Sequence, residues 1–439
     1  MGPCAPRGLQ QRTAAMSSPS SPHADTPRPR TPFLGFAVVG CGAAIAPLDF
    51  AVNMAFPAMT EAFALATPDI RWVAVCYVVT YGSLMLFCGV LGDRLGHLRV
   101  FRWGLVLSAL ALAACAAAPT YGGLLAGRVL QGVGVALTLS CAPALAMGLL
   151  ATGQRTQALS VYGAMFAAAG VLAPLLGGIS MLHWGWAGVY GFRVPIVLLA
   201  WLCTPWLVRR LRAQTLSTPS AASQAGSVRG LWGLLRRDAD FAWINWVSVG
   251  VQFCSFTIAL SLPYALPAAG WGGTASGAML SLWALGVLAG SGVAPVLLRR
   301  MDLRSAGFAA QGAMALGLAW IGAVPMAQAW PFMALALLLQ GLGLGVFQVV
   351  YADQVVATLP DLARGLSGSL TLVTRTVGIV GAAMVWLWLM ERLQSRALAN
   401  GVSHPEAIWA STMGLLPWAA GLTLALLFLS VWRRSSRWH

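Results

Sequence analysis

The sequence contains no lysine, and all 27 of its basic residues are arginine. A chain without lysine cannot form the usual phosphate-binding P-loop, a kinase-type nucleotide site or a Schiff base with a cofactor. We therefore expect no ATP hydrolysis, and the sequence predicts no cofactor.

Metal-ligand and disulfide spacings are missing as well. The eight cysteines lie mostly inside apolar runs and lack any disulfide or zinc spacing. The five histidines are far apart and form no closely spaced pair. We predict no metal site, and because paired catalytic residues are also lacking, we do not expect an enzyme.

Charge is scarce. Only 9% of the residues are charged and 58% are hydrophobic, whereas a soluble domain has about 25% charged residues. Each membrane-spanning helix needs roughly 20 apolar residues, so this chain could supply about twelve spans. The composition predicts an all-α integral membrane protein.

Twelve apolar runs are separated by short polar segments. They cover residues 34–56, 72–92, 103–118, 121–149, 158–181, 189–208, 241–266, 274–298, 306–325, 329–356, 366–390 and 408–432. The longest polar segment between them divides the set six and six. The sequence therefore predicts two six-helix bundles, at 33–208 and 241–432, joined by a linker at 209–240.

The two ends and the arginines predict how the chain is oriented. Residues 1–32 are rich in Pro, Ser, Thr and Arg, which is typical of a disordered tail. If this tail, the linker, the tail at 433–439 and the loops on the same side of the membrane are cytoplasmic, 21 of the 27 arginines lie inside, as the positive-inside rule requires. Orientation thus accounts for the net charge of +15, and nucleic acid is not an expected partner.

The composition also predicts a location. No asparagine begins an Asn-x-Ser/Thr glycosylation site, and the lysine-free, arginine-rich composition is typical of a high-GC bacterium. We expect a multi-pass protein of the bacterial inner membrane with both termini in the cytoplasm. Its partners would be protons, a small solute and the lipid bilayer, with no obligatory protein partner.

Asp49 lies deep in the first apolar run. An intramembrane carboxylate costs several kcal/mol unless it is paired or protonated, so such residues usually have a function. Asn53 follows one helical turn later and would share the same face. We interpret Asp49 as a proton site, with a structural acid held in a salt bridge as the alternative.

Arg128 is the cation that would match Asp49 in depth. It lies about 10 Å below the outer end of its span, at 1.5 Å per residue, and Gln131 follows on the same face. We predict that Arg128 takes part in proton coupling. The alternative is an arginine whose side chain reaches up to the outer interface.

Four motifs resemble the major facilitator superfamily, and particularly its drug:proton antiporter branch. They are the loop Gly89–Arg99, the Leu-Asp-x-x-x-Asn-x-x-x-Pro segment at 48–57, the segment Gly127–Gly134, and the segment Gly170–Gly178. The resemblance implies two six-helix bundles that alternate in opening to each side of the membrane. It also implies that Gly170, Pro174, Gly177 and Gly178 belong to an antiporter motif, where small residues allow close helix packing.

The gating candidates are Asp93, Arg94 and Arg99. The resemblance implies that Asp93 latches the two halves in the outward-open state, near the helix that begins around residue 367. A helix amino terminus attracts a carboxylate by roughly 0.3 to 1 kcal/mol. The alternative is a loop acid that Arg94 or Arg99 neutralises.

The remaining candidates would line a cavity between the halves. Aromatic and polar side chains inside the spans suit lipophilic compounds, although helix packing explains each of them as well. The predicted set is Asn53, Tyr77, Tyr81, Gln131, Gln252, Phe253 and Arg375. Arg375 would bind an anionic solute or pair with an acid.

The sequence thus predicts a proton-coupled exporter of lipophilic small molecules that works by alternating access. One alternative is a facilitator of the same fold that carries a specific metabolite or organic anion. Another is a membrane sensor that does not transport, for which the short linker offers no recognisable domain.

Overall fold

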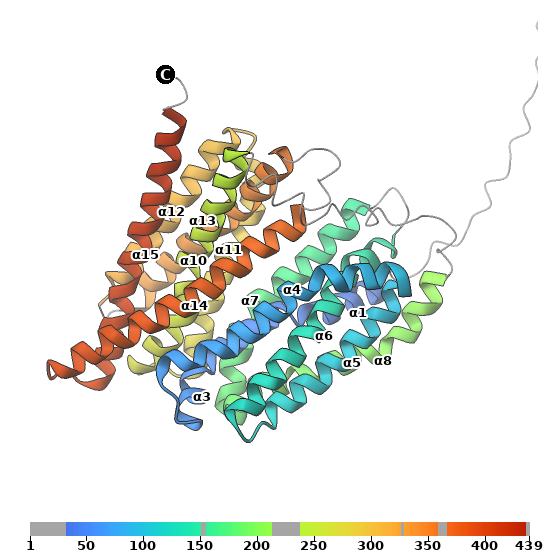
Figure 1. Ribbon diagram of the computed structural model, residues 1–439, viewed down its shortest axis with the longest axis horizontal. Helices are drawn as coiled ribbons and strands as arrows, with labels where there is room; N and C mark the ends of the chain where they lie inside the picture. Colours follow the sequence, from blue (N-terminus) through green and yellow to red (C-terminus); the bar gives the residue numbers. More distant parts are fainter. Residues whose placement is uncertain (1–31, 151–154, 213–237, 326–328, 359–366, 436–439) are drawn as a thin grey trace, which may run out of the picture.

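The computed structural model describes residues 32–150, 155–212, 238–325, 329–358 and 367–435. All regular elements in these ranges are helices. Figure 1 shows them in two groups, with α10 to α15 on the left and α1 to α8 on the right. Three predicted segments lie outside the described residues: all of the tail at 1–32 except Pro32, most of the linker at 209–240, and the last residues of 433–439.

The first half of the chain forms six long or broken helical segments. They comprise α1 (Pro32–Ala44), η1 (Pro47–Phe50), α2 (Ala51–Met54), α3 (Phe56–Ala62), η2 (Thr67–Ile70), α4 (Arg71–Leu95), α5 (His97–Ala116), α6 (Tyr121–Met147), α7 (Arg155–Gly191) and α8 (Arg193–Arg212). The second half forms α10 (Ala239–Ala268), α11 (Gly273–Leu297), α12 (Leu303–Gly322), α13 (Ala329–Thr358), α14 (Ser367–Ala399) and α15 (His404–Ser435). Each predicted apolar run therefore lies largely in helix, although the run at 189–208 begins within α7.

Not every helix is long and apolar enough to cross a membrane on its own. In the described part of the chain, 8 helices meet that requirement, and the number rises to 10 if each of two bent pairs is one span. The apolar stretch Arg193–Leu207 of α8 is shorter. The all-α membrane fold is confirmed, and the count of twelve spans stays a prediction.

The first span is broken, whereas its sequence predicts one continuous helix over 34–56. The chain bends by 41° between Leu34–Ala44 and Pro47–Met54. Pro47 stands in the first turn of η1, where its missing N–H and fixed φ interrupt the helical hydrogen bonds. The break places Asp49 in a short 3₁₀ turn, where its side chain can reach two helices of the same half.

The two halves meet on the predicted outer side. Thr60 Oγ1 and Tyr264 OH are 3.1 Å apart, and the backbone N–H of Leu175 donates to Ser281 Oγ at 3.2 Å. Glycine lets α7 and α11 approach closely, since a Cβ added at Gly178 would lie 2.2 Å from the Gly273 carbonyl oxygen. Only hydrogen fits at such a contact.

The other predicted packing residues lie along the same helix. A Cβ at Gly177 would be 2.9 Å from Ala51 Cα, and one at Gly170 would be 3.7 Å from Pro47 Cβ. The carbonyl oxygen of Pro174 lies 2.3 Å from the position of a Cβ at Gly277. The motif at 170–178 therefore packs α7 against the broken first span and against α11 of the other half.

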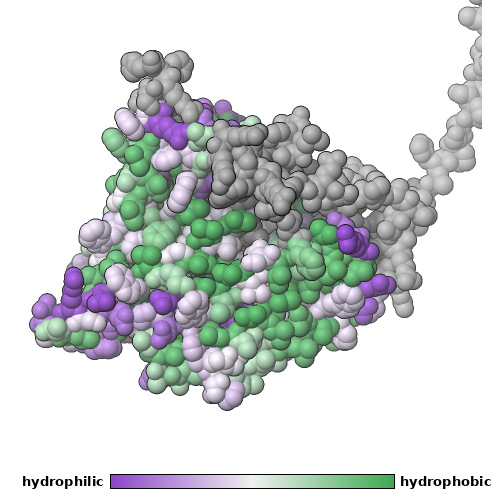
Figure 2. Space-filling view, in the orientation of Figure 1, coloured by the Kyte–Doolittle hydropathy of each residue, from purple (hydrophilic) through white to green (hydrophobic). Residues whose placement is uncertain are grey.

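The molecular surface has the distribution expected of a membrane protein. Figure 2 shows apolar surface over the middle of the visible face, with polar surface gathered at its margins, including the tip where α14 ends. Many large apolar side chains point outward, including Leu182, Trp246, Trp418 and Phe428. In water such a surface would aggregate, whereas in lipid it is the expected exterior.

Candidate functional site

Asp49 and Arg128 form a bidentate ion pair inside the first half. Arg128 donates from Nη1 to Asp49 Oδ1 and from Nη2 to Oδ2, each at 2.7 Å. Arg128 Nε donates to the Val73 carbonyl oxygen at 2.7 Å. This fork geometry holds both side chains in one orientation, and it joins the broken first span to α6 and α4.

A second arginine binds the same carboxylate. Arg193 is the first residue of α8, and its Nη1 donates to Asp49 Oδ1 at 2.8 Å. Its Nε donates to the Val189 carbonyl oxygen at 2.9 Å, while its Nη2 is buried without a hydrogen-bond partner in the described structure. Asp49 is thus shared between α6 and α8.

Gln131 completes the arrangement. It accepts a hydrogen bond from Arg128 Nη1 at 2.8 Å and donates from Nε2 to Asp49 Oδ1 at 3.0 Å. The Arg128 guanidinium also lies 4.3 Å from the centre of the Tyr77 ring, a cation–π contact. We call these five residues, Asp49, Arg128, Arg193, Gln131 and Tyr77, the Asp49 cluster.

The Asp49 cluster carries an excess of positive charge. Arg128 is 1% exposed and Arg193 0%, whereas the Asp49 side chain is 11% exposed. Two guanidinium groups face one carboxylate, so the ionised cluster has a net charge of +1. Buried charge is costly unless it is paired, and here the carboxylate is the shared counter-ion for both arginines.

An aromatic contact next to Asp49 joins the two halves. The Phe50 ring lies 6.0 Å from the Trp283 ring of α11 and 6.3 Å from the Phe256 ring of α10. Trp283 Nε1 donates to Gln340 Oε1, and Gln340 Nε2 donates to Ser255 Oγ at 3.0 Å. The turn that carries Asp49 is therefore in contact with a buried polar network of the second half.

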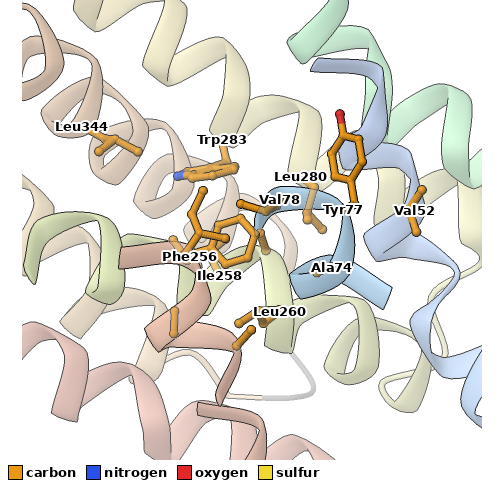
Figure 3. Packing of buried hydrophobic residues seen from close by; sticks show 14 of the residues in the cluster. Val52, Ala74, Tyr77, Val78, Phe256, Ile258, Leu260, Leu280, Trp283 and Leu344 are labelled. Carbon is orange, nitrogen blue, oxygen red and sulfur yellow. The ribbon is translucent and has the colours of Figure 1, made fainter. Parts of the chain in front are cut away.

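The surrounding packing is apolar. In Figure 3, Val78 of the first half lies near Phe256 and Ile258 of the second, while Val52 lies farther off, beyond Tyr77, whose hydroxyl points away from Phe256 and Ile258. These residues belong to one continuous buried cluster. The junction of the halves beside Asp49 is therefore a low-dielectric region, in which electrostatic interactions are strong.

The other predicted cavity residues occupy different surroundings. Tyr81 packs against Tyr77, with ring centres 5.0 Å apart, and Asn53 is buried in α2. Arg375 lies on α14, next to Thr376, which meets Gly82 of α4. Its Nε is buried and has no hydrogen-bond partner among the described residues.

Gln252 and Phe253 lie against α14. A Cβ at Gly378 would be 2.6 Å from Gln252 Cβ, and Trp386 Nε1 donates to the Phe253 carbonyl oxygen at 2.9 Å. Both residues are packing contacts within the second half in this structure. Their predicted place in a cavity stays a prediction.

The three predicted gating residues do not form one unit. Asp93 pairs with His97, one turn further on, at 3.3 Å. Arg94 and Arg99 are exposed on the surface around the start of α5. The predicted latch of Asp93 to the helix near residue 367 stays a prediction.

Sequence reasoning missed Arg193, Phe50, Trp283 and Gln340 as parts of this site. The sequence could have indicated Arg193, because it is one of three arginines that fall within or at the end of a span. Phe50 follows Asp49 directly, but nothing in the sequence pairs it with Trp283. In the described residues, no three His, Cys, Asp or Glu side chains could hold a metal ion together.

A helical membrane protein with two halves, which meet beside a buried charged cluster, has the architecture of a secondary transporter. The model of the Major Facilitator Superfamily matches residues 33–383. The chain belongs to this family of membrane transporters, and it is accordingly a multi-pass membrane protein.

Curated relatives include resistance proteins. The chain is 31% identical over 211 residues to the methylenomycin A resistance protein of Streptomyces coelicolor, covering 48% of this chain and 43% of the relative. It is 25% identical over 238 residues to the tetracenomycin C resistance and export protein of Streptomyces glaucescens, covering 52% and 44%. The matched region spans less than half the length of these relatives.

Solved structures of the same fold include a nucleoside transporter and a bacterial homologue of a lysosomal transporter. The nucleoside transporter NupG superposes with a TM-score of 0.73 at 12% identity, covering 90% of this chain and 99% of that one. A bacterial homologue of the lysosomal transporter Spinster superposes with a TM-score of 0.70 at 15% identity, covering 90% and 96%. At these identities the likeness establishes the fold alone.

Proposed function

We propose that this protein exports lipophilic small molecules in exchange for protons, with Asp49 as the proton site. The observation that carries the proposal is the Asp49 carboxylate, which Arg128 and Arg193 share. An acid at this depth is an expected element of a proton relay. The resistance and export functions named for the relatives support the direction of transport.

The cycle follows from the charge of the Asp49 cluster. With Asp49 ionised, the carboxylate holds the η1 turn to α6 and α8, which is the form after proton release. Protonation removes the only negative charge between two guanidinium groups and leaves them to repel each other. Proton binding is thereby coupled to a movement of the η1 turn, and Phe50 passes that movement to α10 and α11.

Proton entry supplies the energy. One elementary charge that crosses 100 mV is worth about 2.3 kcal/mol, so the exporter needs no ATP. Solute enters from the predicted cytoplasmic side as Asp49 gives up its proton inward. Reprotonation from outside accompanies solute release.

Everted membrane vesicles test this exchange. Addition of transported compounds is expected to cause solute-dependent proton efflux from acid-loaded vesicles for the wild type and for Glu61→Gln, an exposed carboxylate of the same half. Asp49→Asn is expected to bind the compounds and to move no protons. Proton movement at the wild-type rate in Asp49→Asn would show that the proton site lies elsewhere.

A second candidate is transport of a specific organic anion. The net charge of +1 at the Asp49 cluster favours it, as does Arg375 Nε, which has no hydrogen-bond partner among the described residues. Competition separates the candidates, because a panel of lipophilic acids would inhibit an anion carrier and methyl viologen, a dication, would not.

A further inference from the structure

We propose that the cavity between α5 and α8 on the predicted cytoplasmic side binds an anionic phospholipid. In this proposal Arg99 and Arg102 hold the phosphate group, and Trp103, Val106 and Trp201 contact the acyl chains. The site is separate from the Asp49 cluster and does not depend on the function proposed above.

The cavity is formed where three helices come together. It has a volume of about 610 Å³ and is lined by Leu95, Gly96, Leu98, Arg99, Arg102, Trp103, Val106 and Trp201. These residues come from the end of α4, the first turns of α5 and the middle of α8. Figure 1 shows α5 and α8 at the edge of their half, where the bilayer would reach them.

The polar end of the cavity carries positive charge that no carboxylate of the described residues neutralises. Arg99 and Arg102 line it and no carboxylate does. Arg102 Nε is buried without a hydrogen-bond partner in the described part of the chain, and the nearby Asp93 bonds instead to His97. Helix α5 also begins here after Gly96, with no side-chain cap, so its positive end adds to the field.

The other end of the cavity suits hydrocarbon. Trp103 is 49% exposed and Val106 40%, and both lie deeper along α5 than Arg99. On α8, Leu199 and Leu202 are also exposed, beside Trp201. Tryptophan prefers the membrane interface, so the cavity runs from headgroup depth into the acyl region.

With arginines at one end and apolar side chains at the other, the cavity favours a phospholipid over a soluble phosphate. A free anion needs only the arginines, whereas a phospholipid also covers the exposed tryptophan and valine. The cytoplasmic leaflet is rich in anionic lipid, and each arginine near its surface strengthens binding. A basic pocket between spans on that side is the kind of site where anionic headgroups bind.

Native mass spectrometry of the full-length protein in detergent tests the proposal. The wild type is expected to retain phosphatidylglycerol about tenfold better than phosphatidylcholine, and the double variant Arg99→Gln/Arg102→Gln is expected to lose that preference. Arg300→Gln is the matched control, because Arg300 is exposed at the corresponding loop of the second half. The pair Arg99→Lys/Arg102→Lys keeps the charge and is expected to keep the preference.

Three results would overturn the proposal. One is equal retention of the two lipids by the wild type. Another is an unchanged preference in the glutamine double variant while the protein stays folded. The third is displacement of phosphatidylglycerol by sn-glycerol 3-phosphate at equal concentration, which would assign the arginines to a soluble phosphate.

Discussion

Asp49→Asn is expected to destabilise the protein by about 3–5 kcal/mol, more than the loss of either arginine, because it leaves two buried guanidinium groups without a counter-ion. Arg128→Met is expected to cost less, since Arg193 still pairs with the carboxylate. Unfolding of purified protein by sodium dodecyl sulfate in mixed micelles measures these differences.

A double variant provides the control. In Asp49→Asn/Arg193→Leu one of the two uncompensated charges is gone, so we expect the pair to be more stable than Asp49→Asn alone. Residues in one network couple by about 0.5–3 kcal/mol, whereas Glu61→Gln should change stability little. Additive costs for Asp49 and Arg193 would contradict a shared counter-ion.

If the transporter carries organic anions, as in the second candidate, Arg193→Leu is expected to weaken inhibition by organic anions about tenfold. The change lowers the net charge of the ionised cluster from +1 to zero. If the bound anion lies roughly 12 Å from Arg193, this unit charge contributes about 1.4 kcal/mol at an effective dielectric constant near 20, which is a factor of ten. Competition by lipophilic acids against a fluorescent substrate in vesicles measures how strongly the anions inhibit each variant.

Two further variants separate charge from packing. Arg193→Lys keeps the charge and is expected to restore most of the inhibition, even though it loses the bond from Nε to Val189. Arg396→Leu removes an exposed arginine of α14 and should leave inhibition unchanged. If Arg193→Leu and the wild type respond equally to anions, bound solute does not sense the charge of the Asp49 cluster.

The sequence indicated Arg128 as a candidate partner of Asp49, because both depth estimates rest on helix rise and span ends. The same reasoning could not place Arg193, which begins α8 directly after the end of α7. Its depth depends on the length of α7, and that helix contains a break at Gly185, where φ is 62°.

The sequence did not predict the break in the first span either. Apolar composition predicts that residues 34–56 are buried in lipid, but it carries no information on bending. Pro47 was the available signal, since a proline inside an apolar run disrupts the helix there. The break shapes the Asp49 cluster, because a straight helix would not present Asp49 to α6 and α8 in a 3₁₀ turn.

The role of small residues was easier to predict than that of the large ones. Gly177 and Gly178 have few roles in a span besides close packing, and the structure places them at Ala51 and Gly273. Phe253 could line a cavity or fill a core, and sequence periodicity does not distinguish the two. Its contact with Trp386 depends on how α10 and α14 meet.

Infrared difference spectroscopy of the purified protein tests the central claim most directly, since it detects the carboxyl group of Asp49 itself. Addition of a transported compound is expected to remove a C=O stretching band of a protonated carboxyl group in the wild type and in Glu61→Gln. The band change should be absent in Asp49→Asn. If the same band change persists in Asp49→Asn, or if bound compound produces none in the wild type, Asp49 is not the proton site.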